Sequence, residues 1–425
     1  METKNRVVVT GMGIVAPNGV GLSAFSDALK KGTSGIRFFP SLKELQFSCQ
    51  IGGEPIIPKE LIEKYFTALE LRNFNSKGIL YGVMAGMDAL EDAGLKPSEK
   101  EGDPLWDLGI VFGTSTSGID RLRDAIYQVD EGKVRRLGST VVAQTMNSGI
   151  SAYLAGKIGA GNWVTTNSSA CATGTEAILM GYEHIKNGKA KQMLCGSCSG
   201  ASPYIWGGFD ALRVTASKYN ANPQQASRPM SATANGFVPA SGAGALLLED
   251  YETAKKRGAK IYAELLGGHC NNGGQRQGGS MTAPNSVAVQ QCITKALQNA
   301  KIDASEIDYI NGHLTATVKD SVEIENWCEA LKRSGDDFPY INSLKSLIGH
   351  GLAASGSMEV VGAILQMHQG YIARNINCRD LHPEITKMIS AESIPTENQY
   401  VDFTTLIKAS FGFGDVNACA IFRKI

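Results

Sequence analysis

The sequence predicts an α/β protein whose sheets are buried between helices. Short apolar runs alternate with helix-like patterns along all 425 residues, an order typical of sheets that carry helices on both faces. Hydrophobic residues make up 43% of the chain, which is enough for a large core. Because a chain of this length exceeds one typical core, we expect two or three domain equivalents or one closely packed double domain.

The expected strands are short apolar runs. They cover residues 6–10, 108–112, 192–195, 244–249, 309–310, 340–341 and 419–422. Three helices are expected, over 118–129, 171–186 and about 353–367. The first carries Ile119, Leu122, Ile126 and Val129 on one face, and the second carries Ile178, Leu179, Tyr182 and Ile185. In the third, Gly356 and Gly362 suggest close packing against another backbone.

Charge and cysteine content narrow the class of protein. Lys plus Arg and Asp plus Glu both number 41, so the net charge is zero, which disfavours a general nucleic-acid or membrane-surface binder. Nine cysteines at irregular spacings favour a reducing compartment over a disulfide framework. The sequence has no apolar run of about 20 residues and no secretory signal pattern. We therefore expect a cytoplasmic protein.

A cysteine flanked by small residues is the first candidate catalytic group. Cys171 lies in the segment NSSACATG (167–174), where the second helix is expected to begin. First-turn N–H groups and the helix dipole would lower the pKa of Cys171, and small neighbours leave room for a substrate. The alternative is a buried structural cysteine, a common fate of this residue type.

Two histidines lie in loops of the second half. His313 follows an expected strand, and Thr315 and Thr317 would point the same way as His313 if the chain stays extended. The alternative is a strand-end histidine that caps a loop. His350 is flanked by glycines, which let the backbone come close to another group. Its alternative is a packed core histidine.

Two charged residues accompany His350. Lys345 precedes it by five residues, and Glu359 follows it by nine. If Glu359 lies in the following helix, it could turn back toward Lys345. The alternative is a surface lysine.

The segment FGFG (411–414) predicts a mobile loop near the C-terminus, whose N–H groups could form half of an oxyanion hole. The alternative is a simple hairpin turn.

Two other patterns are set aside. The segment GMGIVA (11–16) fits a dinucleotide fingerprint, but a turn follows it where a helix should begin. Cys195 and Cys198 form a lone CxxC without the further ligands that zinc needs.

Taken together, these segments resemble one family in order and spacing: the elongating β-ketoacyl-acyl carrier protein synthases of type II fatty acid and polyketide pathways. The resemblance runs from VVVTGMG (7–13) to FGDVN (413–417) and includes ASRP (226–229) and NGFV (235–238). It implies a thiolase fold, with two similar halves in an α-β-α-β-α layered arrangement. Residues 1–250 would carry the nucleophilic cysteine, and residues 251–425 would carry the two histidines.

The resemblance also implies an acyltransferase chemistry. Cys171 would accept an acyl chain from acyl carrier protein as a thioester. His313 and His350 would stabilise the enolate that forms when malonyl carrier protein loses carbon dioxide, and a 3-oxoacyl carrier protein would result. Lys345, paired with Glu359, would orient the histidines.

Further roles follow from the same resemblance. Phe413 matches the family's gate residue, and its N–H and that of Cys171 would hold the oxyanion. Thr315 and Thr317 match contacts to the phosphopantetheine arm, and Phe209 would also contact substrate. No metal or organic cofactor is expected, because the phosphopantetheine arm arrives on the carrier protein.

The expected partners are acyl carrier protein and a second ketosynthase-like subunit, in a homodimer or heterodimer. The carrier protein is acidic in systems of this kind. Arg213 matches a basic family position near the tunnel mouth, and Arg72, Arg135 and Arg136 could add to a docking patch. No nucleic acid or membrane partner is expected.

Four positions depart from the family pattern. They are Leu314 for Gly, Asn235 for Asp, Ser241 for Glu and Asp415 for Gly. None removes a reactive group, and they point to a specialised pathway such as polyene or pigment assembly.

Three rival functions are disfavoured. Retention of Cys171 argues against a non-catalytic partner subunit, and Cys419, inside an apolar strand, does not fit the second cysteine of a thiolase. A Cys-His hydrolase would not need two histidines and a lysine. The remaining alternative is a catalytic subunit that works only beside a chain-length-factor partner.

Overall fold

The apolar runs form strands of one continuous mixed sheet. The computed structural model describes residues 5–425. The main path of the sheet has the strand order β11-β10-β12-β13-β9-β1-β8-β7-β5-β6. These strands are β1 (Val7–Ala16), β5 (Leu108–Thr114), β6 (Val164–Thr165), β7 (Gln192–Ser199), β8 (Gly242–Asp250), β9 (Ala263–Asn272), β10 (Tyr309–Asn311), β11 (Tyr340–Asn342), β12 (Thr405–Gly412) and β13 (Val416–Arg423).

The two halves of the sheet have the same topology. The first half runs β6-β5-β7-β8-β1, and the second runs β11-β10-β12-β13-β9. In each half the first three strands are parallel and the last two pairings are antiparallel. The halves join where β1 pairs with β9. Since β8 ends at Asp250 and α10 (Tyr251–Lys256) leads toward β9, we propose that the boundary between the halves lies between residues 250 and 251.

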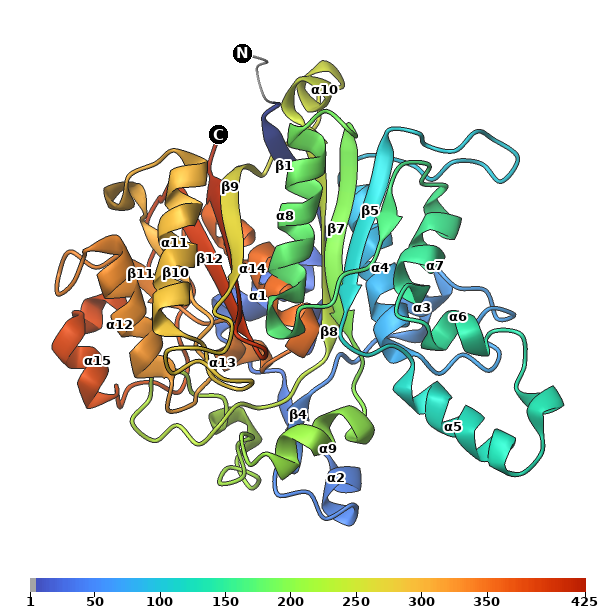
Figure 1. Ribbon diagram of the computed structural model, residues 1–425, viewed down its shortest axis with the longest axis horizontal. Coiled ribbons are helices and arrows are strands. Elements are labelled where there is room, and N and C mark those ends of the chain that lie inside the picture. The colour runs from blue at the N-terminus through green and yellow to red at the C-terminus, as the bar shows by residue number, and fades with distance from the viewer. Residues whose placement is uncertain (1–4) are drawn as a thin grey trace.

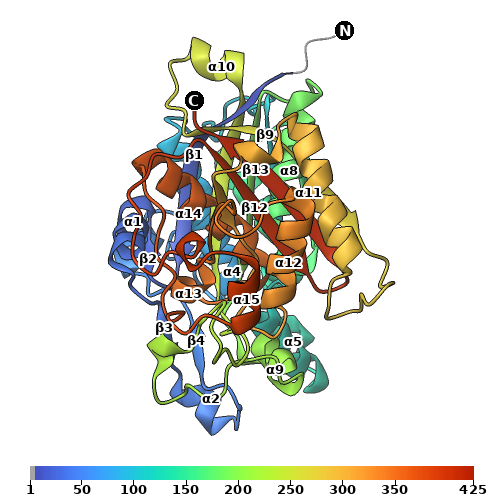
Figure 2. The ribbon, with the colours of Figure 1, turned by 90° about the vertical axis from the view of Figure 1, so that its left-hand side faces the viewer.

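The helices repeat in the same order and form the layers. The outer helices are α4 (Lys77–Asp92) and α7 (Gly149–Ile158) in the first half, and α11 (Ser286–Ala300) and α12 (Asp320–Leu331) in the second. The central helices α8 (Thr173–Lys186) and α14 (Ser355–Gln369) pack against each other and against strands of both halves. Figure 1 shows α11 and α12 on one side of the molecule and α4 and α7 on the other, and Figure 2 shows α14 and α11 on opposite sides of the sheet. The layered α/β fold is therefore confirmed.

Glycine lets the two central helices approach closely. A Cβ on Gly174 would lie 2.3 Å from the backbone nitrogen of Ser357, and one on Gly356 would lie 2.6 Å from that of Thr175. Because no real side chain tolerates such contacts, the close packing expected at Gly356 is confirmed. The two helix N-termini, and the turns before them, are thereby held side by side.

Several expected boundaries differ from the structure. Strand β1 continues through residues 11–16, because Gly11 and Gly13 admit α4: their Cβ atoms would lie 2.1 and 2.0 Å from carbonyl oxygens of that helix. Helix α8 begins at Thr173, so Cys171 precedes it. Helix α5 (Ile119–Asp130) forms as expected.

Within residues 5–425, no helix is long and apolar enough to cross a membrane.

Candidate active site

The duplicated topology places Cys171 and His350 in equivalent turns. Cys171 lies in the 3₁₀ turn η2 (Ala170–Ala172) before α8, and His350 lies just before the 3₁₀ turn η5 (Leu352–Ala354), which leads into α14. Each turn contains a non-glycine residue in the left-handed region, Ala170 at φ 47° and Leu352 at φ 55°. Such backbone costs free energy and is found where a site fixes a side chain. The two loops therefore occupy equivalent places in the duplicated fold.

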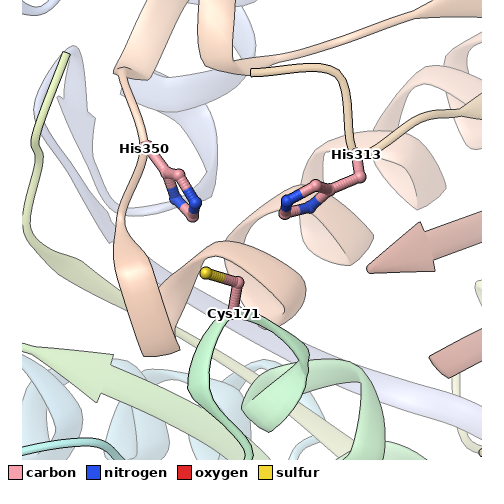
Figure 3. Close-up of side chains that lie close together, drawn as sticks. All are labelled: Cys171, His313 and His350. Atoms are coloured by element: carbon pink, nitrogen blue, oxygen red, sulfur yellow. The ribbon is translucent and has the colours of Figure 1, made fainter. Parts of the chain in front are cut away.

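A thiol and two imidazoles converge at this point. One nitrogen of His313, one nitrogen of His350 and Sγ of Cys171 all lie within 4.8 Å of one another. The two imidazole rings are nearly perpendicular, at 82°, with centroids 5.5 Å apart. Figure 3 shows both rings turned toward Cys171 from opposite sides. Residues from both halves of the chain therefore share one site.

Hydrogen bonds fix the tautomer of His350. The backbone N–H of Leu352 donates to Nδ1 of His350 at 3.1 Å, and the Ser355 hydroxyl lies 2.9 Å from the same atom. Because a backbone N–H can only donate, Nδ1 is unprotonated and the proton of neutral His350 is on Nε2. His350 can therefore donate a hydrogen bond from Nε2.

Two carboxylates that the sequence analysis missed hold the His313 loop. The backbone N–H groups of His313 and Leu314 each donate to Glu323 at 2.7 Å. Asp320 accepts from the N–H groups of Thr315 and Ala316 at 3.0 and 3.1 Å. Both acids lie in the first turn of α12, where acidic residues are favoured, and that position was the available signal. Together they fix the direction of the His313 side chain.

The pKa of Cys171 corrects one expectation. Burial raises the pKa of Cys171 to about 11, although the charge of Lys345 and the N–H groups of Phe413 and Cys171 pull it down. We expected the helix start to lower this pKa. The physical reason for the difference is that Cys171 is buried, with 8% of the residue exposed, so loss of hydration outweighs the hydrogen bonds.

Both histidines are held neutral. Burial lowers the pKa of His313 and of His350 well below 6.5, and the charge of Lys345 lowers both further. Neutral imidazoles can donate one hydrogen bond each to a carbonyl oxygen without titrating near neutral pH.

Lys345 and Glu359 form the ion pair that the sequence suggested. Nζ of Lys345 lies 2.6 Å from Oε1 of Glu359, and both side chains are at most 1% exposed. The surface alternative for Lys345 is therefore excluded. Glu359 lies in α14 and Lys345 in the short helix α13 (Lys345–Ile348), and the charge of Lys345 acts on both histidines.

A cavity of about 440 Å³ opens onto the three reactive side chains. Residues predicted to contact substrate line it with them: Phe209, Thr315, Thr317 and Phe413. The rings of Phe209 and Phe413 are 5.9 Å apart and meet across the cavity beside Cys171. The cavity is mostly apolar and continues between α11 and α12, where Val289 and Val322 line it. An apolar lining with a few polar groups suits a largely apolar ligand.

The predicted docking arginines separate into two groups. Arg213 is exposed and adjoins Val214, which lines the cavity. Arg72, Arg135 and Arg136 are also exposed, but the last two lie in the 3₁₀ turn η1 (Val134–Arg136) beyond α5. None of the four arginines lines the cavity, and only Arg213 is adjacent in sequence to a residue that does.

Cysteine and histidine are also metal ligands. The 4.8 Å spread of the Cys171, His313 and His350 atoms is wider than the roughly 3.5 Å that tetrahedral zinc imposes on its ligands. A metal would therefore need the side chains to move inward. Cys195 and Cys198 lie buried in β7, as two core thiols.

Comparison with known proteins identifies relatives of the whole chain. Residues 4–254 match the family description "Beta-ketoacyl synthase, N-terminal domain", and residues 262–379 match "Beta-ketoacyl synthase, C-terminal domain". The chain is 32% identical to 3-oxoacyl-[acyl-carrier-protein] synthase 1 of Escherichia coli K12, over 99% of each chain.

Two solved structures resemble the fold closely. A beta-ketoacyl synthase from Burkholderia phymatum superimposes with a TM-score of 0.88 at 29% identity, covering 99% of this chain and 100% of that one. A ketosynthase solved with its type II PKS acyl-carrier protein and bound to a hexaketide superimposes with a TM-score of 0.86 at 29% identity, covering 100% of both chains.

Proposed function

The chain belongs to the beta-ketoacyl synthase family, and from that premise we propose that it condenses an acyl chain with a malonyl unit. Both substrates would be carried on acyl carrier protein, and the product would be a 3-oxoacyl carrier protein. The observation that carries this proposal is the convergence of one thiol and two neutral imidazoles within 4.8 Å, beside an apolar cavity.

The first half-reaction is acyl transfer to Cys171. The sulfur attacks the thioester carbonyl, the thiol proton passes to the departing phosphopantetheine sulfur, and an acyl-Cys171 thioester remains. The N–H groups of Cys171 and Phe413 lower the pKa of the Cys171 thiol, and the same groups would stabilise the oxyanion. Phe413 and Phe209, in contact across the cavity, would part to admit the chain.

The second half-reaction needs hydrogen-bond donors for an enolate. Nε2–H of His350 and one N–H of His313 would bond the malonyl thioester carbonyl as carbon dioxide leaves. The carbanion then attacks the acyl-Cys171 carbonyl, and the Cys171 thiolate departs. Preorganised donors in a dry site stabilise such developing charge far better than water does. Lys345 and Glu359 would orient the histidines from behind.

The remaining predicted residues serve binding. Thr315 and Thr317, whose hydroxyls lie 3.2 Å apart in the cavity wall, would contact the phosphopantetheine arm. Arg213 at the mouth would meet an acidic carrier protein, with Arg72, Arg135 and Arg136 as a more distant docking patch. The arm arrives on the carrier, and loss of carbon dioxide drives bond formation without a further cofactor.

Intact-mass measurement of the purified chain tests this proposal. The protein is incubated with acyl carrier proteins bearing chains of different length and then with malonyl carrier protein, and Cys171→Ala is the control. We expect the acyl mass on the wild-type chain but not on the control, followed by a 3-oxoacyl carrier protein. His313→Ala and His350→Ala should acylate without condensing.

The same measurement separates the alternatives. If wild-type Cys171 is acylated but never condenses, the chain requires a partner subunit. If Cys171 is not acylated by any carrier-bound chain, the proposed function is wrong. The donor with the fastest acylation would identify the acyl class, which bears on the specialised pathway suggested by Leu314, Ser241 and Asp415.

A further inference from the structure

A second buried lysine shares the carboxylate of Glu359 with Lys345. Lys408 is in the middle of β12 and is fully buried, and its Nζ lies 2.6 Å from Oε2 of Glu359. The other oxygen of the same carboxylate lies 2.6 Å from Nζ of Lys345. Lys408 also donates to the carbonyl oxygen of Ala409. One carboxylate therefore bridges two ammonium groups in a site closed to water.

We propose that Lys408 is a positioning residue of this site, which completes a buried Lys345–Glu359–Lys408 charge triad that keeps His313 and His350 neutral during decarboxylation. This inference rests on the proposed condensation and adds to it a residue and a role. Two lysines and one glutamate leave a net charge of +1 in the triad. The Lys345–Glu359 pair alone would be neutral.

The excess charge is difficult to explain by stability alone. Transferring an ion from water to a protein interior is expensive, and one carboxylate repays the cost of one ammonium group better than that of two. Burial accordingly lowers the pKa of Lys408, while Glu359 raises it and Lys345 lowers it. A buried lysine that shares one carboxylate with a second lysine, in a cluster whose charge acts on reactive side chains, indicates a functional role.

The charge of Lys408 reaches both histidines. After burial and Lys345, it lowers the pKa of His350, and it also contributes to the lowered pKa of His313. Neutrality matters most for His350, because a proton on Nδ1 would face the N–H of Leu352. Protonation would break that contact and turn Nε2–H away from the substrate carbonyl.

The other titratable groups around Lys408 also make the site more positive when the pH falls. Glu323 of α12 faces Lys408 electrostatically, as does Cys419 of β13, and Tyr309 of β10 faces Glu359. Burial raises the pKa of Glu323 to about 7. As pH falls below 7, Glu323 therefore loses its negative charge, and the positive potential at the histidines increases. The cluster therefore opposes histidine protonation in the pH range in which an ordinary imidazole would become protonated.

Histidine titration tests the triad directly. The chain has six histidines, so ¹³C labelling of histidine gives few NMR signals, which His313→Ala and His350→Ala assign. In wild type we expect both signals to stay neutral well below the usual histidine pKa, because burial and the nearby lysines lower the pKa of both residues. In Lys408→Met and Lys408→Gln, at least one should titrate at a pH about one unit higher, which is a tenfold change in its protonated fraction.

Lys408→Arg is the matched control, because it retains the charge. It should titrate like wild type and preserve the pH profile of malonyl carrier protein decarboxylation, whose acid limb should move upward in the two neutral variants. The proposal is overturned if the neutral variants titrate like wild type, or if Lys408→Arg shifts as they do.

Acylation of Cys171 separates this test from that of the proposed function. A folded Lys408→Met protein should still gain the acyl mass, because Lys408 acts on the histidines. If wild-type Cys171 is not acylated by any carrier-bound chain, the proposed function fails, whereas the NMR titration still decides whether Lys408 controls the histidines.

Discussion

Burial of Cys171 raises the pKa of its thiol, whereas its use as a nucleophile requires the thiolate. Burial raises the pKa of this thiol to about 11, so at pH 7 only about one molecule in 10⁴ carries a thiolate. Because the thiolate is the nucleophile, alkylation of Cys171 by iodoacetamide should accelerate about tenfold per pH unit between pH 7 and 10. Lys345→Met, which removes a charge that lowers this pKa, should react more slowly at every pH. Peptide mass spectrometry locates the label, and a rate that levels off near pH 7 would contradict the assignment.

The sequence identifies reactive side chains better than the residues that support them. Cys171 and His350 were detectable because each lies among small residues before a helix, a local pattern that the duplicated fold then brings together. Lys408 was not detectable, because a lysine within an apolar strand does not indicate which buried carboxylate it will face. The raised pKa of Cys171 was missed for the same reason: exposure depends on chain segments far away in sequence.

At the scale of elements, Asp415 joins two loops at the cavity mouth. Its buried carboxylate accepts from the N–H groups of Gln275 and Asn285 at 2.9 and 2.7 Å. Asp415 has a φ of 65°, the left-handed region that favours glycine, which explains why the family pattern has Gly here. The hydrogen bonds of Asp415 connect the 273–285 loop to the Phe413 segment, and they offset the free-energy cost of its backbone conformation.

Asp415→Gly therefore separates two effects. It relieves about 1–2 kcal/mol of backbone strain but removes two charged hydrogen bonds, each of which contributes roughly 1.5–3 kcal/mol. We expect lower thermal stability and faster hydrogen exchange over residues 275–285, with no change in α4. Asp415→Asn, which keeps the shape but loses the charge, should lie between this variant and wild type. A Gly variant as stable and as protected as wild type would show that the contact has no such role.

Element boundaries were less predictable than element types. The strand expected to end near residue 10 continues through Ala16, because Gly11 and Gly13 lie against α4, a contact that no local pattern encodes. The same two glycines produced the false dinucleotide fingerprint. In the structure these glycines make room for the backbone of a helix.

At the scale of the whole molecule, an apolar surface on α5 and α6 (Val141–Thr145) remains uncovered in the single chain. The face expected from the sequence, with Leu122, Ile126 and Val129, forms on α5, but Ile126 is 51% exposed and Val142 on α6 is 71% exposed. These helices contact each other, and α6 contacts α7, which packs against β6. Within residues 5–425, β6 is the terminal strand of the sheet and pairs with β5 alone. Contiguous exposed apolar side chains of this kind mark interaction sites.

We therefore expect the purified chain to form a dimer through this surface. Light scattering should give twice the mass of one chain for wild type and the mass of a single chain for Ile126→Glu/Val142→Glu, because a buried interface does not tolerate unpaired carboxylates. Tyr400→Glu is the matched control, since Tyr400 is 78% exposed but lies near the other half of the sheet, and it should remain dimeric. A monomeric wild type would contradict self-association. If that monomer also acylated Cys171 without condensing, the same surface would become the expected contact with a related partner subunit.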